Sequence, residues 1–315
     1  MPGLLTHAVP QTGVYIVEHP GGSRVQIGVY DPALPGAENK MRACSGLSDL
    51  AVAMLKRLEE HWSERVFIDE IGYLESSSSA YMNALRELLS QKCVIAAVRK
   101  QDTPFLLELR ERSDVFCVDL DAPFGHAGCV IMASGQSKRF GSNKLTADFR
   151  GEPMIRRILS ATEGVFAQRV VVTRHSEIAQ LCQASGIDVI LHALPHRSDT
   201  VRLGLDAVGS VEGCMFCPAD QPLLRKDTIA SLVLSAAHDP GSIWRPCFGD
   251  TTGSPVLFPK WTFEQLMHLP EGMGGGHVIR MHPDHVRTLS VKDAFELMDA
   301  DDPSALARLL HIDSE

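Results

Sequence analysis

The sequence predicts an α/β protein made of two domains, each a three-layer arrangement of a sheet between helices. The chain of 315 residues is long enough for two buried cores of ordinary size. Strand-like and helix-like segments alternate through both halves, which favours sheets covered by helices. A turn-rich stretch without periodicity, residues 121–128, separates the two series. We therefore expect domains at residues 1–124 and 125–315.

The composition excludes several classes of protein. An apolar content of 44% and a charged content of 22% are typical of a soluble globular chain. The formal net charge of -9 argues against a nucleic-acid binder, which would carry a basic face. No apolar run approaches the ~20 residues of a membrane span, and the N-terminus lacks a signal-peptide pattern. We expect a cytoplasmic protein whose partners include neither nucleic acid nor a membrane.

In the first half, apolar periodicity predicts a hairpin followed by alternating helices and strands. The hairpin strands are expected at residues 14–18 and 24–30. The later elements are expected at residues 47–61 (helix), 65–68 (strand), 80–90 (helix), 93–98 (strand), 105–112 (helix) and 115–118 (strand). This alternation predicts a parallel sheet covered by helices.

The second half shows the same alternation and no internal repeat. Its strands are expected at residues 129–133, 170–173, 188–191 and 214–217, with later strands near Ile243 and Val256. Helices are expected between them at residues 153–162, 177–184, 200–208 and 226–237. The pattern predicts a second α/β domain that folds around its own core.

A loop rich in small residues follows the strand at 129–133. It reads ASGQSKRFGSNK from Ala133 to Lys144. Small residues let the backbone approach a ligand and offer N–H groups to phosphate oxygens. Lys138, Arg139 and Lys144 add positive charge, and Arg139 can hold two oxygens at once. The pattern predicts a nucleoside triphosphate site, and the alternative is a solvated basic turn.

A carboxylate follows the strand at 214–217. Asp220 lies in the segment CPADQP, whose two prolines stiffen the chain. Open α/β sheets bind ligands beyond the carboxyl ends of their strands, and carboxylate oxygens suit Mg²⁺ bound to substrate phosphates. Together with the loop, the position predicts a magnesium site at Asp220. The alternative is a helix cap or turn former.

Two other motifs are weaker candidates for metal sites. Cys214 and Cys217 form a CxxC, but residues three apart in a strand point to opposite faces of the sheet. The 8 cysteines are scattered, several in apolar runs, which is typical of reduced thiols. His277, His282 and His285 have a spacing loosely similar to that of a zinc site, but a proline breaks the segment. We expect these histidines to be surface or loop residues near an acceptor pocket.

Six motifs of the second half, in the same order, resemble those of the MobA/MocA-like molybdenum-cofactor nucleotidyltransferases. They lie at residues 133–144, 197–205, 218–222, 253–258, 272–276 and 298–303. The resemblance implies a Rossmann-like fold of the nucleotide-diphospho-sugar-transferase type. It also implies transfer of a nucleoside monophosphate from a nucleoside triphosphate onto molybdopterin, with release of pyrophosphate.

The resemblance implies a role for each matching residue. The loop N–H groups and Arg139 would bind the β- and γ-phosphates, and Lys144 would reach the α-phosphate. Asp220 and Asp301 would hold the Mg²⁺ cofactor. The implied catalytic residues are Arg139, Lys144 and Asp220, and the implied nucleotide-binding residues are Ala133, Ser134, Gly135, Gln136, Ser137, Arg139, Lys144 and Thr200.

Ser134 bears on the choice of nucleobase. Members of the resembling family that use GTP have Gly at this position, and the CTP users tend to have Ala. The serine matches neither, but it crowds a purine more than Gly does, and the acidic motifs lean toward the CTP branch. We expect CTP. Use of GTP, a sugar-phosphate or alcohol-phosphate acceptor, and a non-catalytic carrier or insertion chaperone of the molybdenum cofactor stay open.

Residues 12–120 resemble a family of small P-loop nucleoside-triphosphatases. Residues 66–72 resemble its Walker-B segment, in which Asp69 would support Mg²⁺ and Glu70 would orient water. The chain contains no Gly-Lys-Ser/Thr, so triphosphate binding there should be poor. We expect a truncated P-loop NTPase-like sheet that serves as a scaffold, docks a molybdoenzyme client or forms a homodimer, or else a recorded start that omits an upstream segment. A missing strand would expose a sheet edge and favour pairing with a partner.

Overall fold

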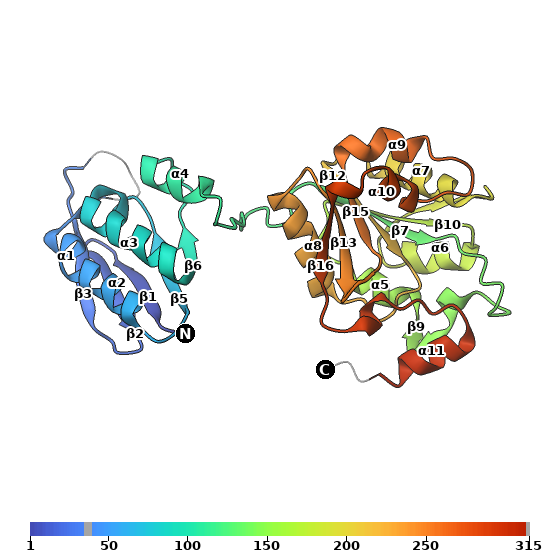
Figure 1. The fold of residues 1–315 in the computed structure, drawn as a ribbon, viewed down its shortest axis with the longest axis horizontal. Coiled ribbons are helices and arrows are strands. Elements are labelled where there is room, and N and C mark those ends of the chain that lie inside the picture. Colours follow the sequence, from blue (N-terminus) through green and yellow to red (C-terminus); the bar gives the residue numbers. More distant parts are fainter. Residues whose placement is uncertain (35–39, 313–315) are drawn as a thin grey trace. The chain divides into compact units, whose positions relative to one another are not determined.

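The computed structural model describes residues 1–34 and 40–312, and the chain forms two compact units, Met1–Cys117 and Val118–Glu315 (Figure 1). The predicted division after residue 124 lies a little further along the chain. Helices and strands alternate along most of both units, so the α/β class is confirmed. None of the described helices is both long and apolar enough to cross a membrane.

The first unit consists of short hairpin strands followed by helices and two further strands. In chain order its described elements are β1 (Gly3–Val9), β2 (Gly13–His19), β3 (Arg24–Tyr30), β4 (Met41–Ala43), α1 (Ser45–Ser48), α2 (Leu50–Glu60), β5 (Arg65–Ile71), α3 (Ser79–Gln91), β6 (Cys93–Val98) and α4 (Pro104–Glu111). Both strands of the predicted hairpin are confirmed, as are the strands and helices expected between residues 65 and 112.

The sheet of the first unit is mixed. Its strand order is β4-β3-β2-β1-β5-β6. Strands β1 to β4 pair antiparallel with one another in this order, whereas β5 is parallel to both β1 and β6. The parallel arrangement predicted for this half therefore holds only for β1, β5 and β6. Hairpin turns are too short for the crossover that parallel neighbours require.

Three segments of the first unit differ from the prediction. Residues 3–9 form β1, although their sequence lacks alternation; pairing with β2 and β5 on both sides outweighs that weak local preference. Residues 115–118, predicted as a strand, form none, and no described strand pairs with them. A short strand without a partner is not stable in water. The single helix expected at 47–61 is broken at Asp49 into α1 and α2.

The described helices of this unit cover one face of its sheet, as α1, α2 and α3 show in Figure 1. The strand residues Leu4, Ile16 and Ile68 face these helices and are at most 2% exposed. Val17 and Phe67, which alternate with them, are only half-buried. A layer of helices over the opposite face, expected for a three-layer domain, does not occur among the described residues.

The second unit has an eight-stranded sheet with helices on both faces. Its main described elements are β7 (Ala127–Ala133), α5 (Ile155–Ala161), β10 (Gln168–Thr173), α6 (Ser176–Gln183), β11 (Asp188–Leu191), α7 (Arg197–Val208), β12 (Gly213–Pro218), α8 (Lys226–His238), β13 (Ile243–Phe248), β14 (Thr251–Thr252), β15 (Val256–Pro259), α9 (Phe263–Met267), α10 (Gly276–Met281), β16 (Val286–Ser290) and α11 (Pro303–Leu310). The short strands β8 (Asp148–Phe149) and β9 (Glu152–Pro153) pair separately. Every strand predicted in this half is confirmed, and its helices begin or end within a few residues of the prediction.

The topology of the second sheet brings the ends of four strands to one edge. The order is β11-β10-β7-β12-β15-β13-β14, with β16 beside β13. Strands β11, β10, β7 and β12 are parallel, and β15 runs antiparallel to both of its neighbours. Helices α5, α6 and α8 contribute to the core on one face, and α7, α9 and α10 to the core on the other (Figure 1). The predicted three layers are thus present in this unit.

Candidate active site

The carboxyl ends of β10, β7 and β12 lie next to one another. The parallel register places Ala133 beside Thr173 and Met132 beside Pro218. The loop that follows β7 and the Asp220 segment that follows β12 therefore share one edge of the sheet. This edge is where open α/β sheets bind their ligands. The juxtaposition of these two motifs, predicted from the sequence, is confirmed.

Side chains at the end of β10 and just beyond it hold the backbone carbonyls of the loop. The Thr173 hydroxyl donates to the carbonyl of Ala133 (3.0 Å), and the Arg174 guanidinium donates twice to that of Ser134 (3.1 and 2.8 Å). The next carbonyl of the loop lies 2.8 Å from Nε2 of His175. Because three consecutive carbonyls are engaged in this way, the loop can present its N–H groups to an anion. This support was not predicted from the sequence, where its only signal is a polar run at the end of the neighbouring strand.

Ser137 and Asn143 close the loop on itself. Ser137 adopts a left-handed backbone with a φ of 47°, and its hydroxyl accepts a hydrogen bond from the N–H of Lys144 (3.2 Å). The Asn143 side chain accepts from the N–H of Leu145 (3.1 Å) and donates to Glu177 (2.9 Å). A non-glycine residue in the left-handed region costs free energy that surrounding contacts must offset. The loop is therefore held in one shape before any ligand arrives.

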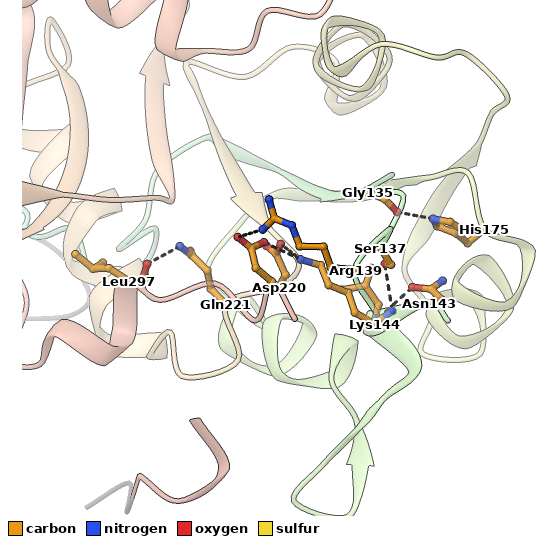
Figure 2. A network of polar contacts seen from close by, with 11 residues as sticks. Gly135, Ser137, Arg139, Asn143, Lys144, His175, Asp220, Gln221 and Leu297 are labelled. Atoms are coloured by element: carbon orange, nitrogen blue, oxygen red, sulfur yellow. Dashed lines mark hydrogen bonds and ion pairs between the residues drawn. The ribbon is translucent and has the colours of Figure 1, made fainter. Parts of the chain in front are cut away.

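Lys144 joins the loop to two carboxylates (Figure 2). Its Nζ lies 2.5 Å from an oxygen of Asp220 and 3.4 Å from one of Asp301, and the residue is 8% exposed. Arg139 stands at the same place, with Nη1 3.8 Å from Asp301, but its side chain is largely exposed. The structure thus brings together the four charged residues that the sequence analysis assigned to phosphate and metal. Their binding roles remain predictions.

Asp299 is a further carboxylate at this site, and the sequence analysis did not single it out. Partial burial, followed by the nearby charge of Asp220, raises the pKa of Asp299 to about 6. Like charges held close together favour the protonated form of one of them. Carboxylates that are held close together despite their mutual repulsion are typical of sites that bind cations. The signal was present in the sequence, because Asp299 belongs to the quoted motif at 298–303.

The donor set is compatible with a hard divalent cation. Asp220 and Asp301 converge on a single positive centre, the Lys144 ammonium, which a cation and a phosphate could share between them. Gln221, next to Asp220, has a buried Oε1 that lacks a hydrogen-bond partner within the described part of the chain. No group of three or more potential ligands of the His, Cys, Asp or Glu type gathers there or elsewhere among the described residues. A cation such as Mg²⁺ would accordingly need oxygens from a substrate to complete its shell.

Ser134 and His192 form a neutral hydrogen-bonded pair beside the loop. The serine Oγ lies 2.9 Å from Nε2 of His192 and 3.1 Å from the carbonyl of Val172. The N–H of Leu194 donates to Nδ1 of His192 (3.2 Å), so the proton of the neutral ring belongs on Nε2. Burial, and then the charge of Arg174, lower the pKa of His192 and keep it neutral. The serine hydroxyl therefore donates to the carbonyl and accepts from the histidine.

Three other predicted residues lie outside this polar network. Gln136 and Lys138 are exposed on the loop. Thr200 is 2% exposed within the first turn of α7. Nucleotide binding by Gln136 and Thr200 stays a prediction.

Cys214 and Cys217 lie as the sequence indicated, on opposite faces of the sheet, whereas His277 lies in α10 and His285 in a short 3-10 turn. Cys214 and Cys217 belong to different cores on opposite faces of the second sheet, where burial raises both of their pKa values. His282 and His285 pack their rings against Trp261, at centroid distances of 4.9 and 5.2 Å. His282 and His285 therefore serve as packing groups.

In the first unit, Asp69 and Glu70 stand at the end of β5 without comparable surroundings. The Glu70 carboxylate forms an ion pair with Arg99, and the N–H of Glu70 donates to the Thr6 hydroxyl (3.1 Å). The segment before β2 is β1, which continues into a hairpin turn and not into a phosphate loop. This arrangement offers carboxylates but no cradle for a phosphate.

Family models match both halves of the chain. Residues 129–286, half of the sequence, match the model described as MobA-like NTP transferase domain, and residues 23–123 match one described as NTPase. Both resemblances inferred from the motifs are confirmed.

Individual relatives match shorter stretches. A probable molybdenum cofactor guanylyltransferase of Aquifex aeolicus is 28% identical over 116 residues, which cover 36% of this chain and 56% of that protein. The 3-deoxy-manno-octulosonate cytidylyltransferase of Neisseria meningitidis serogroup C is 43% identical over 61 residues, covering 19% and 24%. The chain thus spans about half the length of the first relative and about a quarter of the second.

Solved structures support the fold of the second unit. The protein Rv0371c of Mycobacterium tuberculosis H37Rv superposes with a TM-score of 0.52 at 23% identity, covering 59% of this chain and 98% of that one. CMP:2-keto-3-deoxy-manno-octonic acid synthetase, solved with CTP, superposes with a TM-score of 0.51 at 18% identity, covering 59% and 97%. The predicted Rossmann-like, nucleotide-transferase type of fold is confirmed.

Proposed function

Since the chain belongs to the family of MobA-like NTP transferases, we propose that this nucleotidyltransferase moves a nucleoside monophosphate onto the molybdopterin form of the molybdenum cofactor. The acceptor is suggested by the name of the Aquifex relative. The observation that carries the proposal is the convergence of Lys144, Asp220 and Asp301 at the end of a pre-shaped, N–H-rich loop. That arrangement suits an anionic substrate with a chain of phosphates.

In the proposed reaction an oxygen of the acceptor's terminal phosphate forms a bond to the α-phosphorus of the nucleotide. The bond from that phosphorus to the bridging oxygen breaks, and pyrophosphate leaves with the electron pair. Such transfers depend on in-line positioning and on neutralising charge around the phosphorus. Lys144 would supply charge at the α-phosphate, and Arg139 with the loop N–H groups would bind the β- and γ-phosphates. A phosphate ionised near neutral pH needs no general base.

We propose Mg²⁺ as the cofactor, held by Asp220 and Asp301. When bound, this ion would neutralise phosphate charge as a Lewis acid. The Lys144 ammonium, which now lies between the two carboxylates, would then be available to face the substrate. Arg139, exposed at the rim, would follow the phosphates as they bind.

We propose CTP as the nucleotide, with GTP as the alternative that the name of the Aquifex relative favours. The Ser134 hydroxyl is engaged by Val172 and His192, and it retains one lone pair that can accept from an exocyclic amino group. Its side chain also occupies space that a glycine would leave to a purine. Ser134→Gly should therefore shift the ratio of kcat/KM values for CTP and GTP toward GTP by about tenfold. An unchanged ratio would contradict this role of Ser134.

The decisive experiment measures pyrophosphate release by the purified chain with Mg²⁺, molybdopterin cofactor and CTP, GTP or ATP in turn. Release with CTP that requires the cofactor is the expected result. Asp220→Asn should reduce it by about 10²-fold or more, because the variant loses a charged ligand at the reacting phosphates. Asp250→Asn, an exposed aspartate in the β13–β14 turn, is the matched control and should keep full activity.

Other outcomes of this experiment lead to different functions. No release with any nucleotide, from folded protein, would refute the enzyme and favour a carrier of the cofactor. Release that proceeds without molybdopterin but requires a sugar acid would favour the acceptor named for the Neisseria relative. That second function is worth testing because the short match to the cytidylyltransferase has the higher identity of the two.

A further inference from the structure

The segment that carries Asp299 and Asp301 belongs to no strand of the second sheet. It runs from the end of β16 to the start of α11, and its only regular element is a short 3-10 helix, Ala294–Leu297. Asp220, in contrast, lies just beyond β12, so the sheet itself fixes its place. The place of Asp301 must therefore be set by contacts outside the sheet.

Two hydrogen bonds hold this segment against the residues that follow β12. The N–H of Ala300, a fully buried residue, donates to the Asp220 carbonyl (2.8 Å). The Gln221 side chain donates to the Leu297 carbonyl (3.2 Å), as Figure 2 shows. The carboxylates of Asp220 and Asp301 approach the same ammonium group and repel each other. This repulsion favours separation of the segment from the strand end, so a further anchor is needed.

Glu296 supplies such an anchor at the start of α8. The residue is only 2% exposed. One of its carboxylate oxygens accepts from the Thr228 hydroxyl (2.5 Å) and from the N–H of Arg225 (3.4 Å), and the other lies 3.8 Å from Nε of Arg225. A carboxylate at the N-terminus of a helix is also stabilised by the helix dipole. Arg225 forms a second ion pair with Asp293 (2.8 Å), so both ends of the 3-10 helix are attached to α8.

The anchor and the proposed metal ligand are close along the chain. Leu297 follows Glu296 directly, and it packs so closely on Gly253 that a Cβ at that glycine would lie 3.1 Å from it. The backbone is thus held at residues 296, 297 and 300, immediately before Asp301. The side chain of Asp301 is 57% exposed and gains little from packing of its own. The backbone that precedes Asp301 therefore determines where its carboxylate lies.

We propose that Glu296 is a positioning residue of the transferase, which holds residues 297–301 against the end of β12 and so keeps Asp301 within reach of the cation and the phosphates. Glu296 acts through Asp301 and does not itself contact the substrate. The inference rests on the proposed function, because the proposed reaction gives Asp301 its role as a ligand. A purely structural role of Glu296 would instead predict a loss of stability without a specific effect on turnover.

Glu296→Gln in the full chain removes the charge at nearly constant side-chain size. We expect hydrogen exchange of the Ala300 amide, followed by NMR, to become at least tenfold faster, because the segment opens more often. The amide of Ala219, which donates to the Met132 carbonyl (3.3 Å) at the same edge, is the internal reference and should keep its rate. In pyrophosphate release with CTP, kcat should fall about 10- to 100-fold. KM for CTP should change less than about threefold, because the loop after β7 stays intact.

A milder pair of variants separates positioning from a failure to fold. Thr228→Val removes one hydrogen bond to Glu296 at constant volume, and we expect the same changes at about threefold. Thr228→Ser keeps the hydroxyl and should behave as the wild type. Glu75→Gln, at a buried carboxylate of the first unit, is the matched control and should change neither the exchange of Ala300 nor kcat.

The two measurements fail independently. Unchanged exchange of Ala300 in Glu296→Gln, or faster exchange with an unchanged kcat, would overturn the proposal. Equal losses in Thr228→Ser and Thr228→Val would also overturn it, because the hydrogen bond would then not matter. If the wild-type chain releases no pyrophosphate, the proposed reaction fails, and the exchange of Ala300 alone then decides whether Glu296 holds the segment.

Discussion

The end of β7 in the second unit and the end of β5 in the first unit both place acidic groups beyond a parallel strand, but with different surroundings. At β7 a closed loop supplies cations, and buried Lys144 draws Asp220 and Asp301 together. At β5 the carboxylate of Glu70 pairs with the half-exposed Arg99, and a hairpin stands where a phosphate loop would be needed. Carboxylates at a strand end are common to both halves, and the anion-binding loop occurs in one.

This difference indicates what makes a nucleotide site in an α/β unit. Carboxylates can hold a cation, but the triphosphate itself is gripped by backbone N–H groups and fixed positive charge. The loop after β7 is prepared for that task, because Thr173, Arg174 and Ser137 hold its shape. The first unit keeps the acidic half of such a site and lacks the half that binds the anion.

Removal of the Lys144 cation is the strongest test of the comparison. Lys144→Met keeps the length of the side chain but leaves the Asp220 and Asp301 carboxylates facing each other without a cation. We expect kcat for pyrophosphate release to fall by about 10²- to 10³-fold. For Lys138→Met, on the exposed part of the same loop, kcat should fall by less than tenfold. Equal losses in both variants would show that general loop charge, and not the buried position of Lys144, supports the reaction.

Much of the second unit could be predicted from its sequence, because its strands are continuous apolar runs that end in distinctive loops. This pattern and the parallel topology predict the loop that begins at Ala133, the position of Asp220, and the edge of the sheet that both share. The ties from Thr173 and Arg174 could not be predicted. They depend on the register of β10 against β7, and a single sequence does not reveal which polar side chains a neighbouring strand places beside a loop.

The first unit was harder to predict, for reasons of pairing. Strand β1 has weak local preference and exists because β2 and β5 flank it. Residues 115–118 have strong local preference but form no strand, because none of the described strands pairs with them. In both cases the availability of a neighbour decided the outcome, as expected when sheet stability depends on cross-strand contacts.

The hydrogen bonds that shape the loop should contribute to nucleotide binding. Arg174→Gln removes the double hydrogen bond to the Ser134 carbonyl and leaves the loop less ordered. Because the variant must order the loop on binding, we expect KM for the nucleotide to rise about tenfold while kcat changes less. Steady-state kinetics with varied nucleotide measures both constants. Arg287→Gln is the control, because Arg287 in β16 is bonded only to nearby carbonyls in the described structure. A fall in kcat with an unchanged KM for Arg174→Gln would contradict the expected role of Arg174.

A smaller effect is expected on stability at the carboxylate cluster. The pKa of Asp299 is about 6 in the folded chain, above the value of about 3.9 that is usual for an aspartate, so the folded state binds more protons between these pH values. The stability of metal-free protein therefore falls as pH rises through this window, and Asp299→Asn removes that loss. The full shift corresponds to about 3 kcal/mol, but the residue keeps contact with solvent, so we expect a gain of about 1 kcal/mol at pH 8.

Thermal unfolding in EDTA measures this effect. A gain of about 1 kcal/mol should raise the Tm of the second unit by about 2–4 °C at pH 8, and by less at pH 5, where folded Asp299 is already largely protonated. Asp250→Asn should not change Tm at either pH. If Asp299→Asn raises Tm by the same amount at both pH values, the cause is packing and not charge.

The smallest effect is expected in the first unit, where the comparison of the two strand ends predicts no loss of activity. Asp69→Asn with Glu70→Gln removes both acidic groups at the end of β5. Since the described part of the first unit has no loop that would bind a triphosphate, we expect nucleotide hydrolysis to stay at background. Pyrophosphate release should change by less than about twofold. The loss of the Glu70–Arg99 ion pair should change the stability only slightly. Malachite-green assays with ATP, GTP and CTP, without and with added inorganic pyrophosphatase, measure phosphate and pyrophosphate release. A hydrolysis activity that the double variant abolishes would show that the first half binds nucleotides by means other than a phosphate loop, and the contrast between the two strand ends would no longer hold.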